Sequence, residues 1–219
     1  MTEKRKLYKK QINSIREIAK DVFVLSFTRD FEFRAGQVVA LDLTSDGRPR
    51  LYSIASGEQE QDIDILFDEK PDGRLTPLLS SLNSGDSIYV SEPFGNFFCN
   101  DEFAWWIASG TGIAPFISML RSGMDAGKTV IHGSRWDENF YFANLIEKKL
   151  GKNYIRCNSQ QLDTAYHKGR LTQWLKQQPF LPTNIKYYLC GSPEMVVDVR
   201  DLLISRNVPF QHIISETYF

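Results

Sequence analysis

Two glycines near the middle of the chain have the spacing of a turn that could hold a phosphate group. Gly110 and Gly112 flank Thr111, between an apolar run of strand length and apolar residues at helical spacing. Glycine allows a tight turn and a close approach to a ligand, and the first N–H groups of a following helix attract an anion. Because Pro115 stands where the fingerprint Gly-x-Gly-x-x-Gly has its third glycine, the turn alone is equally compatible with a structural role.

A second set of candidate ligands stands at residues 50–53. In a strand, Arg50 and Tyr52 point to the same face. A guanidinium group suits a phosphate, and an aromatic ring two residues further on can cover a flat heterocycle. The hydroxyl of Ser53 could bond to the edge of that ring. The alternative is a strand with a surface arginine and a packed tyrosine.

Composition and cysteine spacing exclude several classes of protein. Cys99, Cys157 and Cys190 are odd in number and far apart, so they offer neither a disulfide framework nor an iron–sulfur spacing, and any redox centre must be brought in. A formal net charge of -1 argues against a nucleic-acid partner. No run of 18 apolar residues predicts a membrane span, and the start of the chain leads into no signal-peptide core, so we expect a cytoplasmic protein.

The first half of the chain carries the signals of a small antiparallel barrel. Short β-rich runs are separated by clusters of Gly, Asp and Pro. The expected strands are Val22–Thr28, Val38–Leu43, Leu51–Ala55, Ile63–Phe67 and Ser87–Ser91. One helix interrupts them at residues 75–82, where leucines are spaced three and four apart and Pro77 lies in the first turn.

In the second half, strands alternate with helices. The expected strands are Phe103–Ala108, Thr129–Gly133, Tyr154–Cys157, Lys186–Cys190 and Ile213–Tyr218. Helices are expected after the glycine turn, around residues 144–150, and over Leu171–Gln177 and Glu194–Ser205. This alternation predicts an α/β doubly wound parallel sheet, which binds ligands beyond the carboxyl ends of its strands. We therefore expect two domains, a β-barrel over residues 1–98 and an α/β domain over residues 99–219.

Several motifs occur together and in a fixed order. They are Arg50-x-Tyr52-Ser53, Gly73-Arg74-Leu75-Thr76, Gly110-Thr111-Gly112-Ile113-Ala114-Pro115, Cys190-Gly191 and a terminal Glu216-Thr217-Tyr218-Phe219. In this combination the chain resembles the ferredoxin–NADP reductase family, and within it the bacterial type that ends in two aromatic residues. The resemblance covers roughly residues 5–219, and it implies an FAD-binding β-barrel followed by a Rossmann-like NADP-binding domain.

The resemblance implies that the first domain holds FAD. Arg50 would bind the FAD pyrophosphate, Tyr52 would lie against the isoalloxazine ring, and Ser53 would hydrogen-bond near flavin N5, with Leu51 between them. The stretch Gly73-Arg74-Leu75-Thr76 would open a helix onto the same pyrophosphate, with Thr76 adding a hydroxyl. This agrees with the general affinity of helix N-termini for anions.

The resemblance also implies where the nicotinamide dinucleotide binds. Thr111 and Gly112 would contact it, with Thr111 also near the FAD, and Cys190 and Gly191 would lie beside nicotinamide C4. A cysteine that ends a buried strand is more often a packed apolar residue. Here the turn that begins at Gly191 favours a site, because it follows the carboxyl end of a strand.

The last residues are expected to cover the flavin. In the family the penultimate tyrosine stacks on the flavin face that nicotinamide must reach, and Tyr218 matches it. Phe219 would cover either the FAD adenine or the flavin. Glu216 would serve in a proton relay or contact the nicotinamide end.

The choice of nicotinamide nucleotide rests on the 2′-phosphate. Ser134, Arg135 and Arg170 lie in loops where the family binds that group, and arginine suits phosphate. Related bacterial enzymes often have an arginine after the third strand, where this chain has Ser159-Gln160. We expect NADPH as the cofactor, with NADH possible. The alternative is that both arginines are solvated surface charges.

A basic cluster at residues 4–10 bears on the partner. Lys4, Arg5, Lys6, Lys9 and Lys10 could steer an acidic carrier protein, ferredoxin or flavodoxin, toward the flavin, or could only solvate a tail. We expect no nucleic-acid or membrane partner, and a monomer.

The implied reaction is hydride transfer from nicotinamide C4 to flavin N5, followed by single-electron transfers to ferredoxin or flavodoxin. Two alternatives stay open. One is an NAD(P)H-dependent flavin or quinone reductase. The other is an electron-transfer subunit of a multi-component oxygenase, although the lack of iron–sulfur cysteines counts against it.

Overall fold

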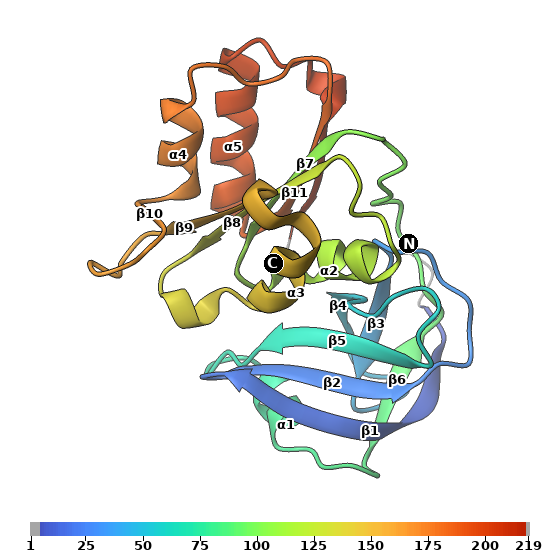
Figure 1. Ribbon diagram of the computed structural model, residues 1–219. Coiled ribbons are helices and arrows are strands. Elements are labelled where there is room, and N and C mark those ends of the chain that lie inside the picture. The colour runs from blue at the N-terminus through green and yellow to red at the C-terminus, as the bar shows by residue number, and fades with distance from the viewer. Residues whose placement is uncertain (1–4, 218–219) are drawn as a thin grey trace. The chain divides into compact units, whose positions relative to one another are not determined.

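Two structural units, each built on one β-sheet, make up the computed structural model, which describes residues 5–217 (Figure 1). The barrel unit contains the chain up to Phe98 together with Ala114–Ser122. The parallel-sheet unit contains Cys99–Ile113 and the chain from Gly123 onward. Among the described residues, no helix is long and apolar enough to cross a membrane, and no group of His, Cys, Asp or Glu is placed to hold a metal ion.

The barrel unit is a six-stranded antiparallel sheet in the order β4-β3-β6-β1-β2-β5. Its elements are β1 (Leu7–Ala19), β2 (Val22–Thr28), β3 (Val38–Asp42), β4 (Arg50–Ser53), β5 (Asp62–Asp68), α1 (Thr76–Ser80) and β6 (Ser87–Ser91). A bridge between Ile54 and Ile65 links the two edges, so the sheet closes on itself. Apolar side chains from all of these strands except β4, with Leu75 and Leu79 from α1 and the turn before it, fill the interior.

The long strand β1 was not predicted from the sequence. Its pattern is weak because only Leu7 and Ile12 are buried over 13 residues, and two irregularities break its register with β2. Lys9 and Lys10 lie within this strand, so the interpretation of the basic residues as a solvated tail is wrong for these two.

Helix α2 (Ala114–Arg121) groups with the barrel unit through its contacts. Ser118 Oγ donates to the Ser56 carbonyl at 2.6 Å, and Arg121 pairs with Asp64 at 2.7 Å. The ring of Phe116 packs 5.7 Å from that of Phe97. The helix therefore has a buried apolar face and a charged end fixed to β5.

The parallel-sheet unit has the strand order β10-β9-β8-β7-β11-β12. Its strands are β7 (Ala104–Ser109), β8 (Lys128–Ser134), β9 (Tyr154–Asn158), β10 (His167–Lys168), β11 (Lys186–Gly191) and β12 (Ile213–Thr217). Its helices are α3 (Ala143–Leu150), α4 (Leu171–Gln177) and α5 (Pro193–Ser205), with short 3-10 turns η1 (Gly110–Ile113), η2 (Asp137–Asn139), η3 (Gly151–Asn153) and η4 (Phe210–His212). From β7 the chain first builds outward through β8 and β9, then returns to add β11 on the other side. The strand order therefore reverses between β7 and β11, the place where such sheets bind nucleotides.

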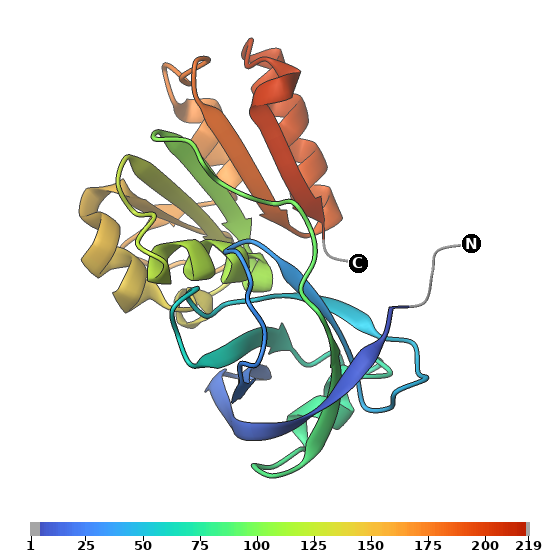
Figure 2. The ribbon, with the colours of Figure 1, turned by 90° about the vertical axis from the view of Figure 1, so that its right-hand side faces the viewer.

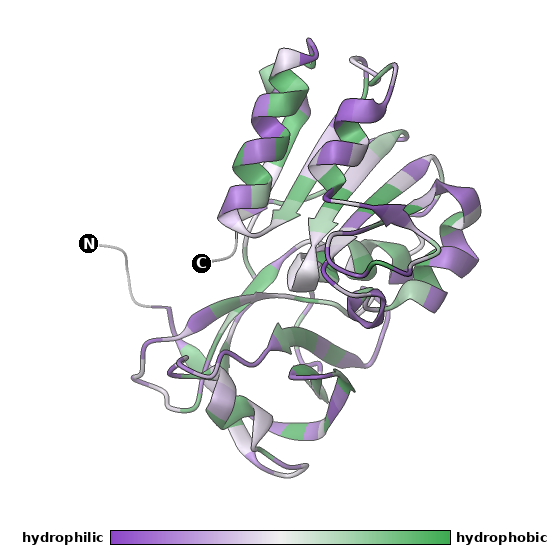
Figure 3. Cartoon of the chain, turned by 90° about the vertical axis from the view of Figure 1, so that its left-hand side faces the viewer, coloured by the Kyte–Doolittle hydropathy of each residue, from purple (hydrophilic) through white to green (hydrophobic). Residues whose placement is uncertain are grey.

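Helices cover both faces of this sheet. Helices α4 and α5 lie on one face, and α3 lies on the other (Figure 2). The strands are largely hydrophobic, while the helices beside them carry hydrophilic patches (Figure 3). Residues alternate along β8, so Ile131 packs into the core beneath α4 and α5, whereas His132 belongs to the opposite face.

The predicted strands and helices of this half agree with the structure to within one or two residues at each described end. Helix α5 begins at Pro193, where Ser192 caps it by accepting from the Met195 N–H at 3.3 Å. Strand β10 was not predicted, because two residues carry no periodicity.

Candidate functional site

The glycine turn follows β7 directly as η1, and its two glycines are required for different reasons. Gly110 has φ of +54°, and no atom of the described residues lies within 4 Å of the place where its Cβ would stand. Gly112 has no open side, because a Cβ there would lie 2.4 Å from the Cys190 carbonyl oxygen. Gly110 therefore supplies an unusual backbone conformation on an open side. Gly112 allows close packing against the end of β11.

Three of the predicted residues meet at the carboxyl edge of the parallel sheet. Cys190 is paired in register with Ala108 on one side and with Glu216 on the other, and Gly112 packs against its carbonyl. The Ser192 N–H donates to Ser109 Oγ at 3.2 Å, which ties the ends of β7 and β11 together. Cys190 is fully buried, as a packed apolar cysteine would be, so its position and not its burial supports a role in binding.

The residues predicted for the 2′-phosphate lie near the carboxyl ends of β8 and β10. Arg135 and Arg170 are exposed, and neither forms an ion pair with a described carboxylate. Ser134 is different, because its hydroxyl donates to the Trp136 carbonyl at 3.0 Å. Ser134 is thus engaged locally, while both guanidinium groups are available to an anion.

Asp137 organises the loops around these arginines, and the sequence did not suggest it. Its carboxylate accepts from Asn158 Nδ2 at 2.6 Å, from Thr164 Oγ1 at 2.8 Å and from Gln161 Nε2 at 3.2 Å. The Ser159 N–H donates to the Ser134 carbonyl at 2.9 Å. These bonds hold the β8 and β9 loops together. They also place in a region proposed for phosphate a carboxylate that pairs with no cation among residues 5–217.

In the barrel unit, two arginines and two carboxylates act on the charge state of Tyr52. Burial raises the pKa of the Tyr52 phenol, the charges of Asp68 and Asp42 add to that rise, and the charges of Arg50 and Arg74 act against it. Arg50 is exposed and forms no ion pair with a described residue. Arg74 donates to the buried Asp42 carboxylate at 3.1 Å and to the Arg48 carbonyl. Arg50 is therefore free for a phosphate, whereas Arg74 also fixes the β3–β4 loop.

The turn before α1 fits a close backbone approach. A Cβ on Gly73 would lie 2.9 Å from the Lys70 carbonyl oxygen, so only glycine fits without a shift. Thr76 Oγ1 accepts from the Lys70 N–H at 2.9 Å, which leaves its own hydrogen to donate. Leu75 is buried and anchors the turn, and Leu51 on β4 is 58% exposed.

Ser53 is 2% exposed and ends β4 beside Val38. The predicted residues Tyr218 and Phe219 lie outside the described residues. Strand β12 brings the chain as far as Thr217, which pairs with Gly191.

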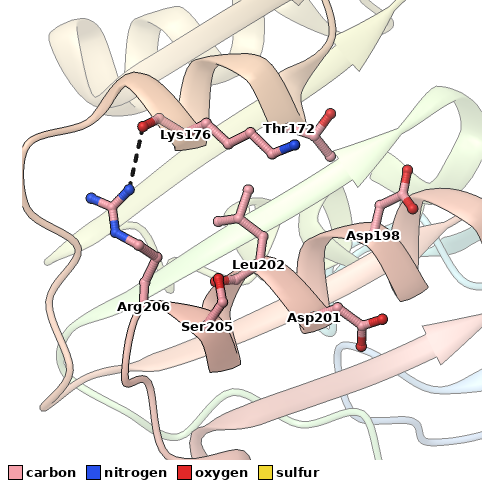
Figure 4. A pocket seen from close by; sticks show the side chains of 7 residues that line it. All are labelled: Thr172, Lys176, Asp198, Asp201, Leu202, Ser205 and Arg206. Atoms are coloured by element: carbon pink, nitrogen blue, oxygen red, sulfur yellow. Dashed lines mark hydrogen bonds between the residues drawn. The ribbon is translucent and has the colours of Figure 1, made fainter.

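A surface groove between α4 and α5 offers a different kind of site (Figure 4). Its lining carries both signs of charge, including Lys176, Asp198 and Arg206. Arg206 is occupied by the backbone carbonyls of Lys176 and Gln178, at 3.3 and 2.6 Å. The groove lies on helix surfaces and not at the carboxyl ends of strands, so it does not have the placement of a dinucleotide site.

Comparison with known proteins matches both halves of the chain. Residues 9–99 match the model of the oxidoreductase FAD-binding domain, and residues 106–201 match that of the oxidoreductase NAD-binding domain. The chain is 28% identical to a ferredoxin–NADP reductase of Pseudomonas aeruginosa, over 91% of this chain and 90% of that protein. It is 26% identical to the toluate 1,2-dioxygenase electron transfer component of Pseudomonas putida, over 92% of this chain and 64% of that protein.

The fold has a close solved counterpart. A ferredoxin NADP+ reductase from Neisseria gonorrhoeae, solved with FAD and NADP bound, superimposes with a TM-score of 0.87 at 21% identity, over 99% of this chain and 100% of that one. The antiparallel barrel that matches the FAD-binding domain and the doubly wound sheet that matches the NAD-binding domain define a flavoprotein oxidoreductase that uses FAD and a nicotinamide dinucleotide. Within that class, the chain belongs to the oxidoreductases that join an FAD-binding domain to an NAD-binding domain, and it is homologous to ferredoxin–NADP reductases.

Two polar residues, the partly buried Asp137 and the fully buried His132, were missed from the sequence as parts of the site. The role of Asp137 could be recognised only from its hydrogen-bond partners in the structure, which come from three later positions of the chain. His132 stands in the His-Gly-Ser-Arg run that drew attention to Arg135, yet its imidazole lies inside the unit. The sequence offered one signal for these two residues: each is polar and stands at, or a few residues after, the carboxyl end of a predicted strand.

Proposed function

We propose that the protein transfers electrons from NADPH to ferredoxin or flavodoxin through FAD, as a ferredoxin or flavodoxin–NADP reductase. The observation that carries this proposal is the set of guanidinium groups, at the two predicted phosphate sites, that form no ion pair with any described residue. They are Arg50 in the barrel unit, and Arg135 and Arg170 in the parallel-sheet unit. An arginine left without a carboxylate partner at a predicted phosphate site is suited to bind a phosphate bidentately. In this proposal residues 1–98 form the FAD-binding domain and residues 99–219 the NAD(P)-binding domain.

The barrel unit would hold FAD by its pyrophosphate and its ring. Arg50 and the Thr76 hydroxyl would bind the pyrophosphate, together with the backbone of the Gly73 turn. Tyr52 would lie against the isoalloxazine, and Ser53 would donate to its edge. The raised pKa of Tyr52 keeps the phenol neutral, so it adds no negative charge beside the phosphates. Bound FAD supplies the conversion between two-electron and one-electron chemistry.

The parallel-sheet unit would bind NADPH across the edge where its strand order reverses. Arg135 and Arg170 would bind the 2′-phosphate, and Thr111 and Gly112 would contact the nicotinamide half. Cys190 and Glu216, neighbours in register on β11 and β12, would lie at the nicotinamide end. The Glu216 carboxylate would there accept a proton or a hydrogen bond from the carboxamide.

The carrier protein would approach the barrel unit at its exposed basic side chains. Arg5, Lys6 and Lys9 are exposed, whereas Lys10 pairs with Asp30. Arg5 lies 3.5 Å above the Phe94 ring, which holds its charge in place on the surface. A positive surface of this kind accelerates association with an acidic protein.

Steady-state kinetics with alternative donors and acceptors tests the proposal. We expect NADPH to be used in preference to NADH, and ferredoxin or flavodoxin to saturate at micromolar concentrations while free FMN does not. Lys9→Glu should raise the KM for the carrier roughly fivefold at low salt and less at high salt. Lys152→Glu, at an exposed lysine of the parallel-sheet unit, is the matched control and should leave that KM unchanged. Equal use of FMN and carrier, or NADH preferred over NADPH, would contradict the proposal.

The match to the toluate dioxygenase component favours one second candidate, a reductase that serves an oxygenase. In the same assays, an oxygenase reductase would prefer NADH to NADPH. It would transfer electrons to an oxygenase component and not to flavodoxin.

A further inference from the structure

His132 is a polar residue buried directly beneath the glycine turn. It is the fifth residue of β8 and pairs in register with Ala108, two residues before Gly110. Its imidazole has no exposed surface. A ring with two polar nitrogens is costly to bury unless both are hydrogen-bonded. This position was not assigned a role by any motif in the sequence.

Aromatic rings enclose the imidazole on the face of the sheet that α3 covers. Phe140 meets it edge-on with centroids 5.3 Å apart, and Tyr141 meets it at 6.5 Å. Tyr154 stacks near it at 6.4 Å with an interplanar angle of 30°. The ring orientation is therefore fixed by packing, and rotation to a new partner would disturb three neighbours.

Hydrogen bonding decides which nitrogen carries the proton. Nδ1 lies 3.2 Å from the Tyr154 hydroxyl oxygen. Burial lowers the pKa of His132 to about 4 and raises the pKa of the Tyr154 phenol, so both groups are neutral near pH 7. If the phenol donates to Nδ1, the hydrogen of the neutral ring must sit on Nε2.

The surroundings of the other nitrogen favour the same tautomer. Nε2 has no well-formed hydrogen bond among the described residues. The glycine turn begins two residues after Ala108, the strand partner of His132, and the Gly110 backbone opposes part of the fall in the His132 pKa. An unprotonated Nε2 would oppose the lone pairs of the Gly110 carbonyl, whereas Nε2–H can donate to it.

We infer that His132 is a positioning residue whose Nε2–H donates to the Gly110 carbonyl when the nicotinamide nucleotide binds, and so fixes the Gly110–Gly112 turn in the arrangement that receives it. The inference rests on the proposed function of that turn. Gly110 can respond because its side of the turn is open, whereas Gly112 is held against β11. Binding of the nucleotide would then shorten a contact that is incompletely formed without it.

Nitrogen NMR of the FAD-loaded protein gives a readout that does not depend on turnover. The chain has three histidines, so the His132 imidazole resonances can be assigned by their loss in His132→Gln. We expect a proton on Nε2 and none on Nδ1. Adding NADP+ should shift the Nε2–H resonance toward that of a stronger hydrogen bond, while His212 in η4 stays unchanged. A proton on Nδ1, or a His132 signal that ignores NADP+, would overturn the inference.

Two substitutions separate positioning from packing. His132→Phe keeps an aromatic ring but removes the donor, and it should raise the KM for NADPH about tenfold, the effect of one lost hydrogen bond, with kcat and FAD content little changed. His132→Gln keeps an N–H donor and should recover most of that loss. If His132→Phe does not fold, Tyr154→Phe serves instead, because without the phenol the Gly110 carbonyl alone selects the tautomer, and the NMR spectrum should still show the proton on Nε2. Equal effects of Phe and Gln on KM, or a proton on Nδ1 in Tyr154→Phe, would refute the role.

The wild-type protein distinguishes this inference from the proposed function. Absence of NADPH oxidation by the wild type would refute the proposed function, whichever nitrogen of His132 carries the proton. Normal NADPH oxidation with an NADP+-insensitive His132 would remove only the inference.

Discussion

Replacing His132 with glutamine should remove a large part of the pH dependence of folding from the parallel-sheet unit. In the folded protein the fully buried imidazole has a pKa of about 4, whereas an unfolded histidine titrates near its ordinary value of 6.5. The unfolded chain therefore binds a proton first as the pH falls. The stability contribution is complete above the unfolded pKa, and it is lost as the pH falls toward the folded pKa.

The size of this effect follows from the two pKa values. Integrating proton uptake between about pH 7 and about pH 5 gives a loss of about 2 kcal/mol in the free energy of unfolding, and the full loss below both values is about 3 kcal/mol. Glutamine does not titrate, so the variant should lack this part of the slope. Glutamine also packs differently from the imidazole, and this lowers the free energy of unfolding of the variant by an amount that does not change with pH.

Urea unfolding followed by tryptophan fluorescence reports on the parallel-sheet unit, which contains His132. All four tryptophans, Trp105, Trp106, Trp136 and Trp174, belong to the parallel-sheet unit. The measurement compares the FAD-loaded wild type and His132→Gln at several pH values in that interval. His167→Gln is the comparison variant, because burial also lowers the pKa of His167 but the residue is only partly buried.

The difference in unfolding free energy between wild type and His132→Gln should shrink by about 2 kcal/mol from pH 7 to pH 5. His167→Gln should change the pH dependence of the unfolding free energy less than His132→Gln does. Parallel stability curves for wild type and His132→Gln would show that the imidazole is not held neutral in the folded state, and the tautomer argument would fall with it.

Three further substitutions test separate parts of the site. Gly112→Ala should destabilise the parallel-sheet unit by about 3 kcal/mol in urea unfolding, because its Cβ would overlap the Cys190 carbonyl. Gly110→Ala should cost only about 1 kcal/mol, from backbone strain. Equal losses of unfolding free energy would contradict the packing argument. Arg170→Ala should raise the KM for NADPH about tenfold or more and leave the KM for NADH nearly unchanged, and equal effects would remove Arg170 from the phosphate site. Arg50→Ala should weaken FAD binding about tenfold in equilibrium dialysis, and unchanged affinity would exclude Arg50 from the pyrophosphate.

Regular patterns made most of the fold predictable. The bounds of Val22–Thr28, Ser87–Ser91 and Leu171–Gln177 agree with β2, β6 and α4, because in each case apolar periodicity ends at a clear turn or cap. Strand β1 was missed because polar and charged residues together fill most of its positions and its register is irregular. Such a strand is specified by its neighbours in the barrel, and not by its own sequence.

The same distinction holds for the site. Gly110 and Gly112 could be found because glycine spacing is local, although their separate reasons appear only in the packing. The Asp137 network could not be predicted, since its donors come from β9 and the loop that follows it. The bond from Arg74 to Asp42 spans 32 residues and was equally invisible.

The match of the barrel unit to the FAD-binding domain leads to the central claim, which is that the chain binds FAD. Titration of the flavin-free protein with FAD and with FMN, followed by visible absorption, tests it most directly. The account predicts one FAD per chain and much weaker binding of FMN, which has no pyrophosphate for Arg50 and Thr76. A protein that takes up neither flavin, or binds FMN as tightly as FAD, would contradict it.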